Sequence, residues 1–262
     1  MWHKFSQARI LCLLFVVLFL TACSAIPAGD GDARSAASLG TQWGEGCESR
    51  VTTVQARRVT PNQPDDVAQL LYGDADGVRA KVGDAPERQL NMPMAQGDVE
   101  WSVRDETDQP LALQRTRQSP GGAFNIAGRK GMRYMLVFHN LSERAYEMVA
   151  TVDGLDVLNG QPGSRSNTGY VLYPRDTLRI EGFRKSNSEV AAFRFAEVNR
   201  AYAANTPAGD VRNVGVIGAA LFQLEMPRSQ RTPRGGATSS RPNPFPADSG
   251  NSSYAPPPDY RK

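Results

Sequence analysis

The chain has 262 residues, and its 30 Lys and Arg against 27 Asp and Glu leave a net charge of only +3. This near-balance excludes the strongly basic character of a nucleic-acid-binding domain, although the isoelectric point is about 8.8. With two histidines and three cysteines in the whole chain, few residues are available for a zinc site or a His-based catalytic triad.

The N-terminus carries the pattern of an export signal. Lys4 and Arg9 form a basic region, and residues 10–20 form an apolar run that is too short to span a bilayer comfortably. The run ends in Leu20-Thr21-Ala22-Cys23, which resembles the lipobox of bacterial lipoproteins. The resemblance implies that residues 1–22 are a signal peptide, cut between Ala22 and Cys23, and that Cys23 is acylated. An ordinary secretory signal and an uncleaved anchor are the alternatives.

Cleavage would change the charge and the cysteine content of the mature chain. The leader takes away two basic residues, so 28 basic residues remain against 27 acidic ones. Cys12 leaves with the leader and Cys23 carries lipid, which leaves Cys47 as the only thiol and allows no intramolecular disulfide. We expect Cys47 to be buried or to take no part in bonding, with a bridge to another chain as the alternative. Because Ser24 rather than Asp follows Cys23, the lipoprotein resemblance also implies an outer-membrane location facing the periplasm.

The first half of the mature chain gives weaker signals. Residues 23–46 are rich in Ala, Gly, Ser and Asp without apolar periodicity, which predicts a lipidated N-terminus followed by a flexible tether. Residues 47–120 are predicted to form the N-terminal part of the folded region. The β-branched residues 50–54 predict a strand, and Asn62–Gly73 predicts a short helix with Pro64 in its first turn. Residues 73–97 predict no element.

Residues 121–226 predict a β-sandwich domain. Apolar and polar residues alternate over 132–139 and 146–152, as in long strands, and Asp153-Gly154 is a strong turn pair. Further strand signals follow at intervals of roughly ten residues, with connections too short for helical crossovers. These features predict a mainly β chain with an antiparallel β-sandwich and one or two short helices, and they favour a sandwich over a barrel. The remaining predicted elements are strands at 170–173, 178–180, 191–196 and 211–225 and a helix-like stretch at 197–205.

The C-terminal segment, residues 227–262, has eight prolines and a net charge of +4. It lacks the apolar residues needed to offset the entropy of ordering, so a disordered tail is predicted. Pro242–Pro246 and Pro256–Pro258 favour an extended polyproline-II conformation, which docking segments often adopt. This basic tail is expected either to have no partner or to bind anionic envelope polymers or lipid headgroups weakly.

Several motifs in order resemble a family of uncharacterised bacterial proteins whose activity is unassigned. The resemblance covers about residues 121–225 and implies a self-contained domain there, but it implies no reaction and no ligand. The segments that carry the resemblance are residues 152–160, 169–174, 180–186, 189–195 and 213–218.

Catalytic and metal-binding motifs are weak in this chain. His139 is the only histidine left after loss of the leader, it lies beside a predicted turn, and no G-x-S-x-G motif accompanies it. Asp74-Ala75-Asp76-Gly77 resembles part of a calcium loop, but Gly83 stands where the last carboxylate is needed. Asp153 and Asp156 flank a turn, which is ordinary hairpin chemistry. We therefore predict no catalytic residue, no metal and no cofactor.

Surface recognition has somewhat more support. Tyr146, Tyr170, Tyr173 and Phe183 lie near predicted strand ends, where aromatic residues can form a partner surface, although core packing is the favoured interpretation. The sequence thus predicts a non-catalytic binding or scaffolding protein, held to the membrane by its N-terminal lipid. Its expected partner is an envelope protein or a cell-wall polymer, and not a nucleic acid. The alternative is an envelope hydrolase acting on polysaccharide or peptidoglycan.

Overall fold

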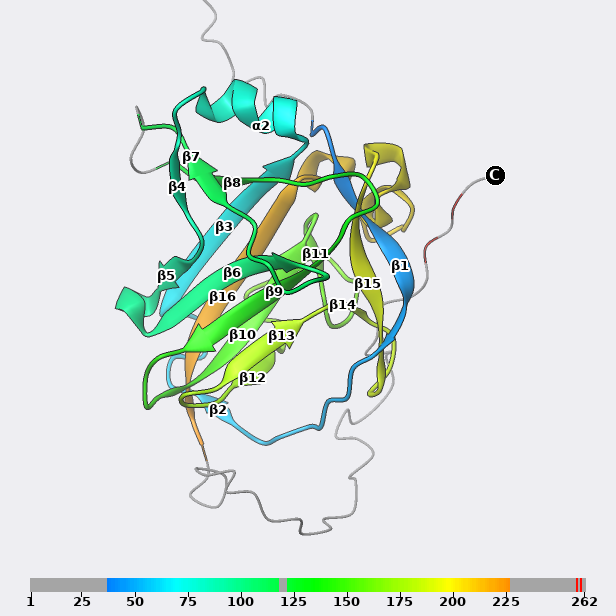
Figure 1. The fold of residues 1–262 in the computed structure, drawn as a ribbon. Helices are drawn as coiled ribbons and strands as arrows, with labels where there is room; N and C mark the ends of the chain where they lie inside the picture. Colours follow the sequence, from blue (N-terminus) through cyan, green and yellow to red (C-terminus); the bar gives the residue numbers. More distant parts are fainter. Residues whose placement is uncertain (1–36, 118–121, 227–257, 259, 261–262) are drawn as a thin grey trace, which may run out of the picture. The chain divides into compact units, whose positions relative to one another are not determined.

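The computed structural model describes residues 37–117, 122–226, 258 and 260, and within them two β-sheets pack face to face (Figure 1). The mainly β sandwich predicted from the sequence is confirmed. Residues 1–36, with Ala22 and Cys23, and the tail residues 227–257 lie outside the described residues, so the predicted signal peptide, lipid site and disordered tail stay predictions.

Sheet A has seven strands among the described residues. Its pairs are antiparallel, and a register shift between Trp43 and Gly46 marks a bulge in its outermost strand, β1. In spatial order the strands are β1 (Gly40–Glu48), β15 (Glu189–Ala196), β9 (Arg133–Asn140), β6 (Val99–Asp105) and β5 (Met92–Met94), with β13 (Thr177–Ile180) beside β9 and β14 (Gly182–Arg184) beside β15.

Sheet B has nine strands among the described residues, and its one parallel pair is β3 with β8. In spatial order the strands are β11 (Leu155–Asp156), β10 (Ala145–Val152), β16 (Val216–Glu225), β3 (Asp66–Gly73), β8 (Phe124–Ala127), β7 (Leu113–Arg115) and β4 (Glu87–Gln89), with β12 (Tyr170–Leu172) beside β10 and β2 (Arg57–Arg58) beside β16.

The β-sandwich includes strands from outside residues 121–226, the range predicted for it. In sheet A, β6 lies between β9 and β5, and in sheet B, β3 lies between β16 and β8, so strands from both halves of the chain share each sheet. Strand β1 already begins at Gly40, inside the segment expected to be a tether. Residues 121–226 are therefore not a self-contained sandwich, because their central strands need partners from residues 40–105.

Strand β3 replaces the helix predicted over Asn62–Gly73. Leu70 and Tyr72 are buried while Val67 and Gln69 are exposed, which is the period of a strand. The acidic residues and Pro64 that favour a helix start precede the strand, and partners on both sides of β3 override the local preference. The only α-helix among the described residues, α2 (Ala75–Val82), forms instead where no element was predicted.

Two further segments differ from expectation. Residues 50–54 pair with no strand of the described chain, so their β-branched composition does not produce a ladder. The helix-like stretch at 197–205 forms two short 3₁₀ turns rather than an α-helix. Among the described residues, the 3₁₀ segments are η1 (Ala95–Gly97), η2 (Val198–Arg200), η3 (Tyr202–Ala204) and η4 (Val211–Asn213).

Aromatic side chains fill the space between the sheets. The rings of Trp101 and Phe138 stack with centroids 5.3 Å apart, and the Tyr134 and Phe195 rings stack at 4.3 Å. Burial of such rings supplies a large share of the hydrophobic stabilisation of the sandwich.

A buried carboxylate also lies in this core, at the turn between β10 and β11. Asp153 and Gly154 both have positive φ angles, so the Asp-Gly pair forms the predicted two-residue turn. The carboxylate of Asp153 accepts hydrogen bonds from the Tyr72 hydroxyl (2.6 Å), the Thr41 N–H (2.8 Å) and the Gly215 N–H (2.9 Å). It thereby links strands of both sheets.

Candidate functional site

A groove with a cavity volume of about 900 Å³ lies where strands β12 and β13 are adjacent. The chain passes from sheet B to sheet A between these two strands, so the groove lies beside the edges of both sheets. One wall consists of residues 50–56, which we name the strap, and another consists of residues 158–169 and β12. This volume is in the range of small-molecule and peptide sites.

The strap joins β1 to β2 without forming a strand. Its position is held at one end by the Val51 N–H, which donates to the Asn187 carbonyl (2.9 Å), and Val51 packs against the core. Within the described part of the chain, the backbone of residues 52–56 makes no hydrogen bond, and Thr52 and Thr53 are exposed. One wall of the groove therefore offers unused backbone donors and acceptors.

Strand β12 offers the same groups from the opposite wall. It pairs with β10 on one side, and no described strand pairs with its other side. In an extended strand, alternate residues direct their N–H and C=O groups to opposite sides, so part of the Tyr170–Leu172 backbone faces away from β10. A short free edge of this kind can accept an added strand.

The lining of the groove combines apolar side chains with neutral hydrogen-bonding groups. Its apolar residues include Val51, Val54, Leu158, Val171, Leu172 and Leu178. Its amide and hydroxyl residues include Thr52, Thr53, Asn159, Gln161, Asn167 and Thr168. This composition suits a ligand with alternating apolar and amide groups better than a highly charged one.

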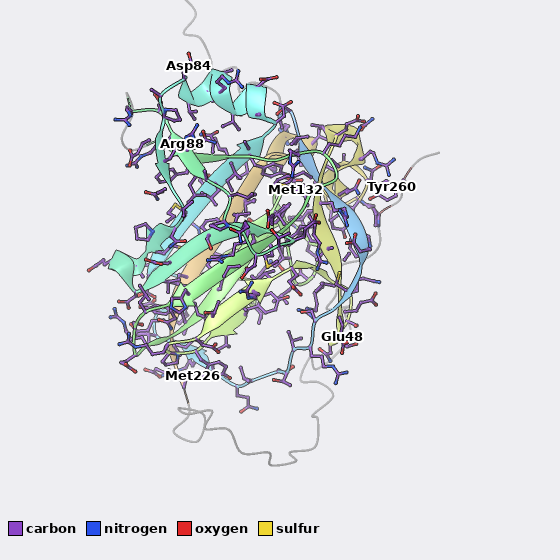
Figure 2. The ribbon with its side chains drawn as sticks, viewed as in Figure 1. Glu48, Asp84, Arg88, Met132, Met226 and Tyr260 are labelled. Carbon is purple, nitrogen blue, oxygen red and sulfur yellow. The ribbon has the colours of Figure 1, made fainter. Side chains whose placement is uncertain are left out.

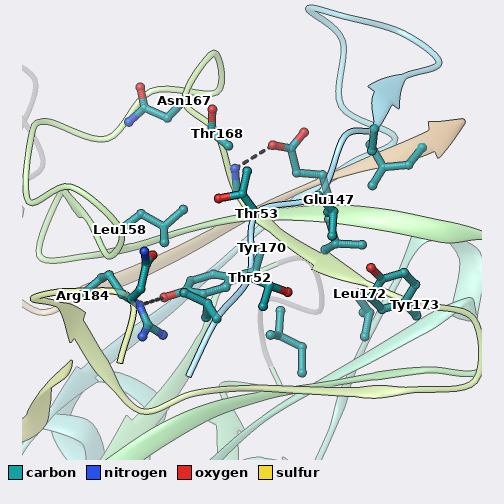
Figure 3. A pocket seen from close by; sticks show the side chains of 18 of the residues that line it. Thr52, Thr53, Glu147, Leu158, Asn167, Thr168, Tyr170, Leu172, Tyr173 and Arg184 are labelled. Carbon is teal, nitrogen blue, oxygen red and sulfur yellow. Dashed lines mark hydrogen bonds between the residues drawn. The ribbon is translucent and has the colours of Figure 1, made fainter. Parts of the chain in front are cut away.

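The floor of the groove is fixed by Arg184 and Tyr170 (Figure 3). The Arg184 Nε donates to the Tyr170 hydroxyl at 3.1 Å, and its Nη1 donates to the Ser49 carbonyl at 2.6 Å. Arg184 is only 3% exposed, so its charge is largely removed from water. Burial raises the pKa of Tyr170, while the nearby guanidinium opposes that rise. The tyrosine therefore stays neutral and held in place.

A buried ion pair fixes the wall formed by residues 158–169. Glu147 on β10 accepts from the Arg58 Nε at 2.6 Å and from the Gly169 N–H at 2.6 Å; the second bond is drawn in Figure 3. Arg58 also donates to the carbonyls of Arg165 (2.8 Å) and Asn167 (2.5 Å). These charge-assisted bonds tie the loop before β12 to sheet B.

The four aromatic residues predicted as a partner surface separate into two pairs. Tyr170 and Tyr173 line the groove, and burial raises the pKa of both phenols. Tyr146 and Phe183 are core residues, 2% and 0% exposed. Tyr146 directs its hydroxyl to Asp98, and Phe183 packs on Phe193, so neither is available to a partner. Strand-end position alone does not distinguish the two pairs.

The remaining residues considered for chemistry are dispersed. His139 is exposed on β9 with its Nδ1 2.8 Å from the Thr177 hydroxyl, and Cys47 is a half-exposed free thiol on β1. Asp74 caps helix α2 by accepting from the Gly77 N–H, which gives the D-x-D-G fragment a structural role. Asp153 and Asp156 are each 1% exposed and lie outside the groove.

Sequence reasoning missed the groove because its walls come from distant segments. No sequence motif marks the strap, the loop before β12 or Arg184. Their place in one groove is seen only from the unpaired strand edges in the structure. Among the described residues there is no group of three or more metal-ligating side chains. No helix in the described ranges has the length and apolar character needed to cross a membrane.

Comparison of the chain with protein-family models, with curated proteins and with solved structures gives no significant match. The resemblance of residues 121–225 to an uncharacterised bacterial family therefore stays a prediction.

Proposed function

We propose that this chain is a lipid-anchored protein of a bacterial envelope that acts by binding, and that the groove is its binding site. The lipobox-like segment ending at Cys23 supports the anchor, and Ser24 supports placement on the periplasmic side of the outer membrane. The groove supports binding because it is large, partly apolar and positioned by buried hydrogen bonds.

One observation carries the proposal: two stretches of backbone without strand partners line the same groove. A ligand placed between the strap and β12 meets N–H and C=O groups on both sides. An extended polypeptide has the complementary pattern, because its own N–H and C=O groups alternate along both edges. We therefore propose an extended segment of another envelope protein as the ligand.

The lining supports the same ligand class. Val171 and Leu178 provide apolar contacts, while Asn159 and Asn167 provide amide groups that satisfy polar side chains. Hydrogen bonds to the ligand's backbone give affinity without requiring a particular ligand sequence. Side-chain pockets then give the preference for some ligand sequences over others. An adaptor that tolerates several related partners is a natural use of such a site.

The alternative function, hydrolysis of an envelope polysaccharide, gains no support from the groove. Two carboxylates line it, Glu147 and Asp176. Glu147 is held by Arg58 and Gly169, so the described groove lacks the pair of unengaged carboxylates that glycoside hydrolysis uses.

A matched pair of strap variants tests the proposal. Thr53→Pro removes a backbone N–H that has no partner in the described chain, whereas Thr53→Ala keeps it. We expect a photo-crosslinking residue at Val171 to capture an envelope polypeptide in cells carrying Thr53→Ala and to lose most of it with Thr53→Pro. A crosslinker at Val211, which is 57% exposed outside the groove, is the control for random encounters.

Three results would contradict the proposal. Equal capture by the Thr53→Pro and Thr53→Ala variants would show that the strap backbone does not take part in binding the ligand. The same adducts from Val171 and Val211 would show that the groove is not selective. A glycan adduct at Val171, in place of a polypeptide, would overturn the proposed ligand class.

A further inference from the structure

The chain leaves sheet B at Met226 and contacts sheet A again at Tyr260, near its C-terminus (Figure 2). The guanidinium carbon of Arg200 lies 5.7 Å from the centroid of the Tyr260 ring. The Tyr260 phenol also lies near the backbone of Trp43, on β1. Tyr260 is 42% exposed, so more than half of its surface is covered.

The residues that receive Tyr260 are themselves held rigidly. The Trp43 ring lies 5.0 Å from the Tyr202 ring and stacks on Phe183 at 6.2 Å. Tyr202 and Phe183 are fully buried, so the Trp43 indole packs against side chains that are fixed in the core. Arg200 ends the 3₁₀ segment η2, next to the buried Ala201. The contact is therefore built on the folded core.

Strand β1 is the outermost strand of sheet A, so one side of its backbone has no strand partner among the described residues. The bulge after Trp43 interrupts the regular ladder to β15 at this point. An outer strand of this length is a template for pairing with another chain unless something covers it. Tyr260 lies near Trp43 of this strand.

We propose that the surface formed by Trp43 and Arg200 is a docking site for Tyr260 of the same chain. The occupant is the segment around Tyr260 of the same molecule. Its phenol lies near the β1 backbone, and its ring accepts the Arg200 cation. The docked segment thereby shields the free edge of β1 from other strands.

The contact depends on the covalent connection. It comprises one cation–π contact at a partly exposed position, which is weak. The covalent connection supplies an effective concentration on the order of millimolar, which is enough to populate a contact of that strength. We therefore expect a free peptide with the same sequence to bind only at about millimolar concentration. Burial raises the pKa of the Tyr260 phenol, which keeps it neutral at physiological pH.

Fluorine NMR of the full-length protein, purified in detergent and labelled with 5-fluorotryptophan, tests the docking. The sequence has three tryptophans, and Trp43→Phe identifies the Trp43 resonance. Tyr260→Ala should shift that resonance and leave Trp101, in the core, unchanged. Tyr254→Ala, a matched change in the same C-terminal segment, should have no effect. Adding a peptide of residues 255–262 to the Tyr260→Ala protein should restore the native chemical shift of Trp43. The same peptide with alanine in place of Tyr260 should bind at least about tenfold more weakly.

Two outcomes would overturn the proposal. An unchanged Trp43 resonance in Tyr260→Ala would show that the tyrosine does not dock. A Trp43 resonance in the unmodified protein that moves on dilution, together with a change from dimer to monomer mass, would show that a second copy supplies the occupant. Neither outcome depends on the groove, so this test is independent of the proposed function.

Discussion

The Tyr72 hydroxyl donates a 2.6 Å hydrogen bond to a carboxylate oxygen of Asp153, joining β3 to the β10–β11 turn inside the core. Because that proton is used, the Thr41 hydroxyl donates to the Tyr72 oxygen (2.8 Å), and the Tyr134 hydroxyl donates to Thr41 (2.6 Å). Three hydroxyls thus form a chain that ends on one buried acid.

Stability should depend on the protonation of Asp153. Burial outweighs the hydrogen-bond donors and raises its pKa from 3.8 to about 6. The folded state therefore holds a proton that the unfolded chain releases, so this group's contribution to stability is greatest below pH 4 and is lost as the pH rises to about 6. The loss is about 3 kcal/mol. Urea unfolding of Asp153→Asn between pH 4 and 7 should lack this decline.

Two comparisons make that measurement specific. Tyr72→Phe removes a donor to the carboxylate, which should raise the Asp153 pKa further and steepen the decline. Glu45, whose pKa the Arg194 side chain lowers to about 2, contributes with the opposite sign and cancels in the difference between variants. The interpretation fails if the unmodified protein and Asp153→Asn show the same pH dependence.

The ion pair between Arg58 and Glu147 should be strongly coupled. Both side chains are nearly buried, at 13% and 12% exposed, so Arg58→Met leaves a buried carboxylate without its partner and should cost about 3 kcal/mol. Adding Glu147→Gln removes the charge while keeping an acceptor for the Gly169 N–H. The double variant should recover at least half of the loss in urea unfolding. Strict additivity of the two single changes would contradict the coupling.

Asp74 should act as a helix cap and not as a calcium ligand. Its carboxylate accepts from the Gly77 N–H, so Asp74→Ala should lower stability by about 1 kcal/mol and Asp74→Asn by a few tenths. Asp76, the other acid of the fragment, is 91% exposed, and Asp76→Asn should be neutral. Millimolar calcium should leave the melting temperature of all four proteins unchanged. A calcium-induced rise that Asp76→Asn abolishes would restore the metal interpretation.

The lipid anchor has a direct test. Cys23→Ser removes the thiol that acylation requires, so labelling with an alkyne fatty acid should be lost and the protein released from the membrane fraction. Cys47→Ser, a change at a half-exposed thiol on β1, is the matched control and should keep the label. Full membrane retention of the Cys23→Ser protein would contradict the anchor.

The fold class was predictable because the strands after Met132 alternate clearly and short turns separate them. Strand β3 was not predictable locally, since Pro64 and the following acids imitate a helix start. Its alternation of exposed Val67 and Gln69 with buried Leu70 and Tyr72 is a strand signal, but β16 and β8 decide the outcome from far along the sequence. Tertiary partners outweigh propensity at this position.

The candidate site was less predictable than the fold. Residues 50–54 have strand composition, yet they pair with no strand of the described chain and form one wall of a groove instead. The roles of Tyr170 and Phe183 could not be separated from sequence, because both are aromatic residues close to a strand end. In the structure Phe183 packs in the core, whereas Tyr170 lines the groove.

The position of β16 affects how the protein folds. This last strand lies between β10 and β3, and β1 pairs with β15, so neither sheet can be completed until nearly all residues up to Glu225 are present. Contacts between such distant segments slow folding into the millisecond-to-second range. A chain synthesised from its N-terminus therefore cannot complete either sheet until most of its residues have been made, so closure of the sandwich is a late event.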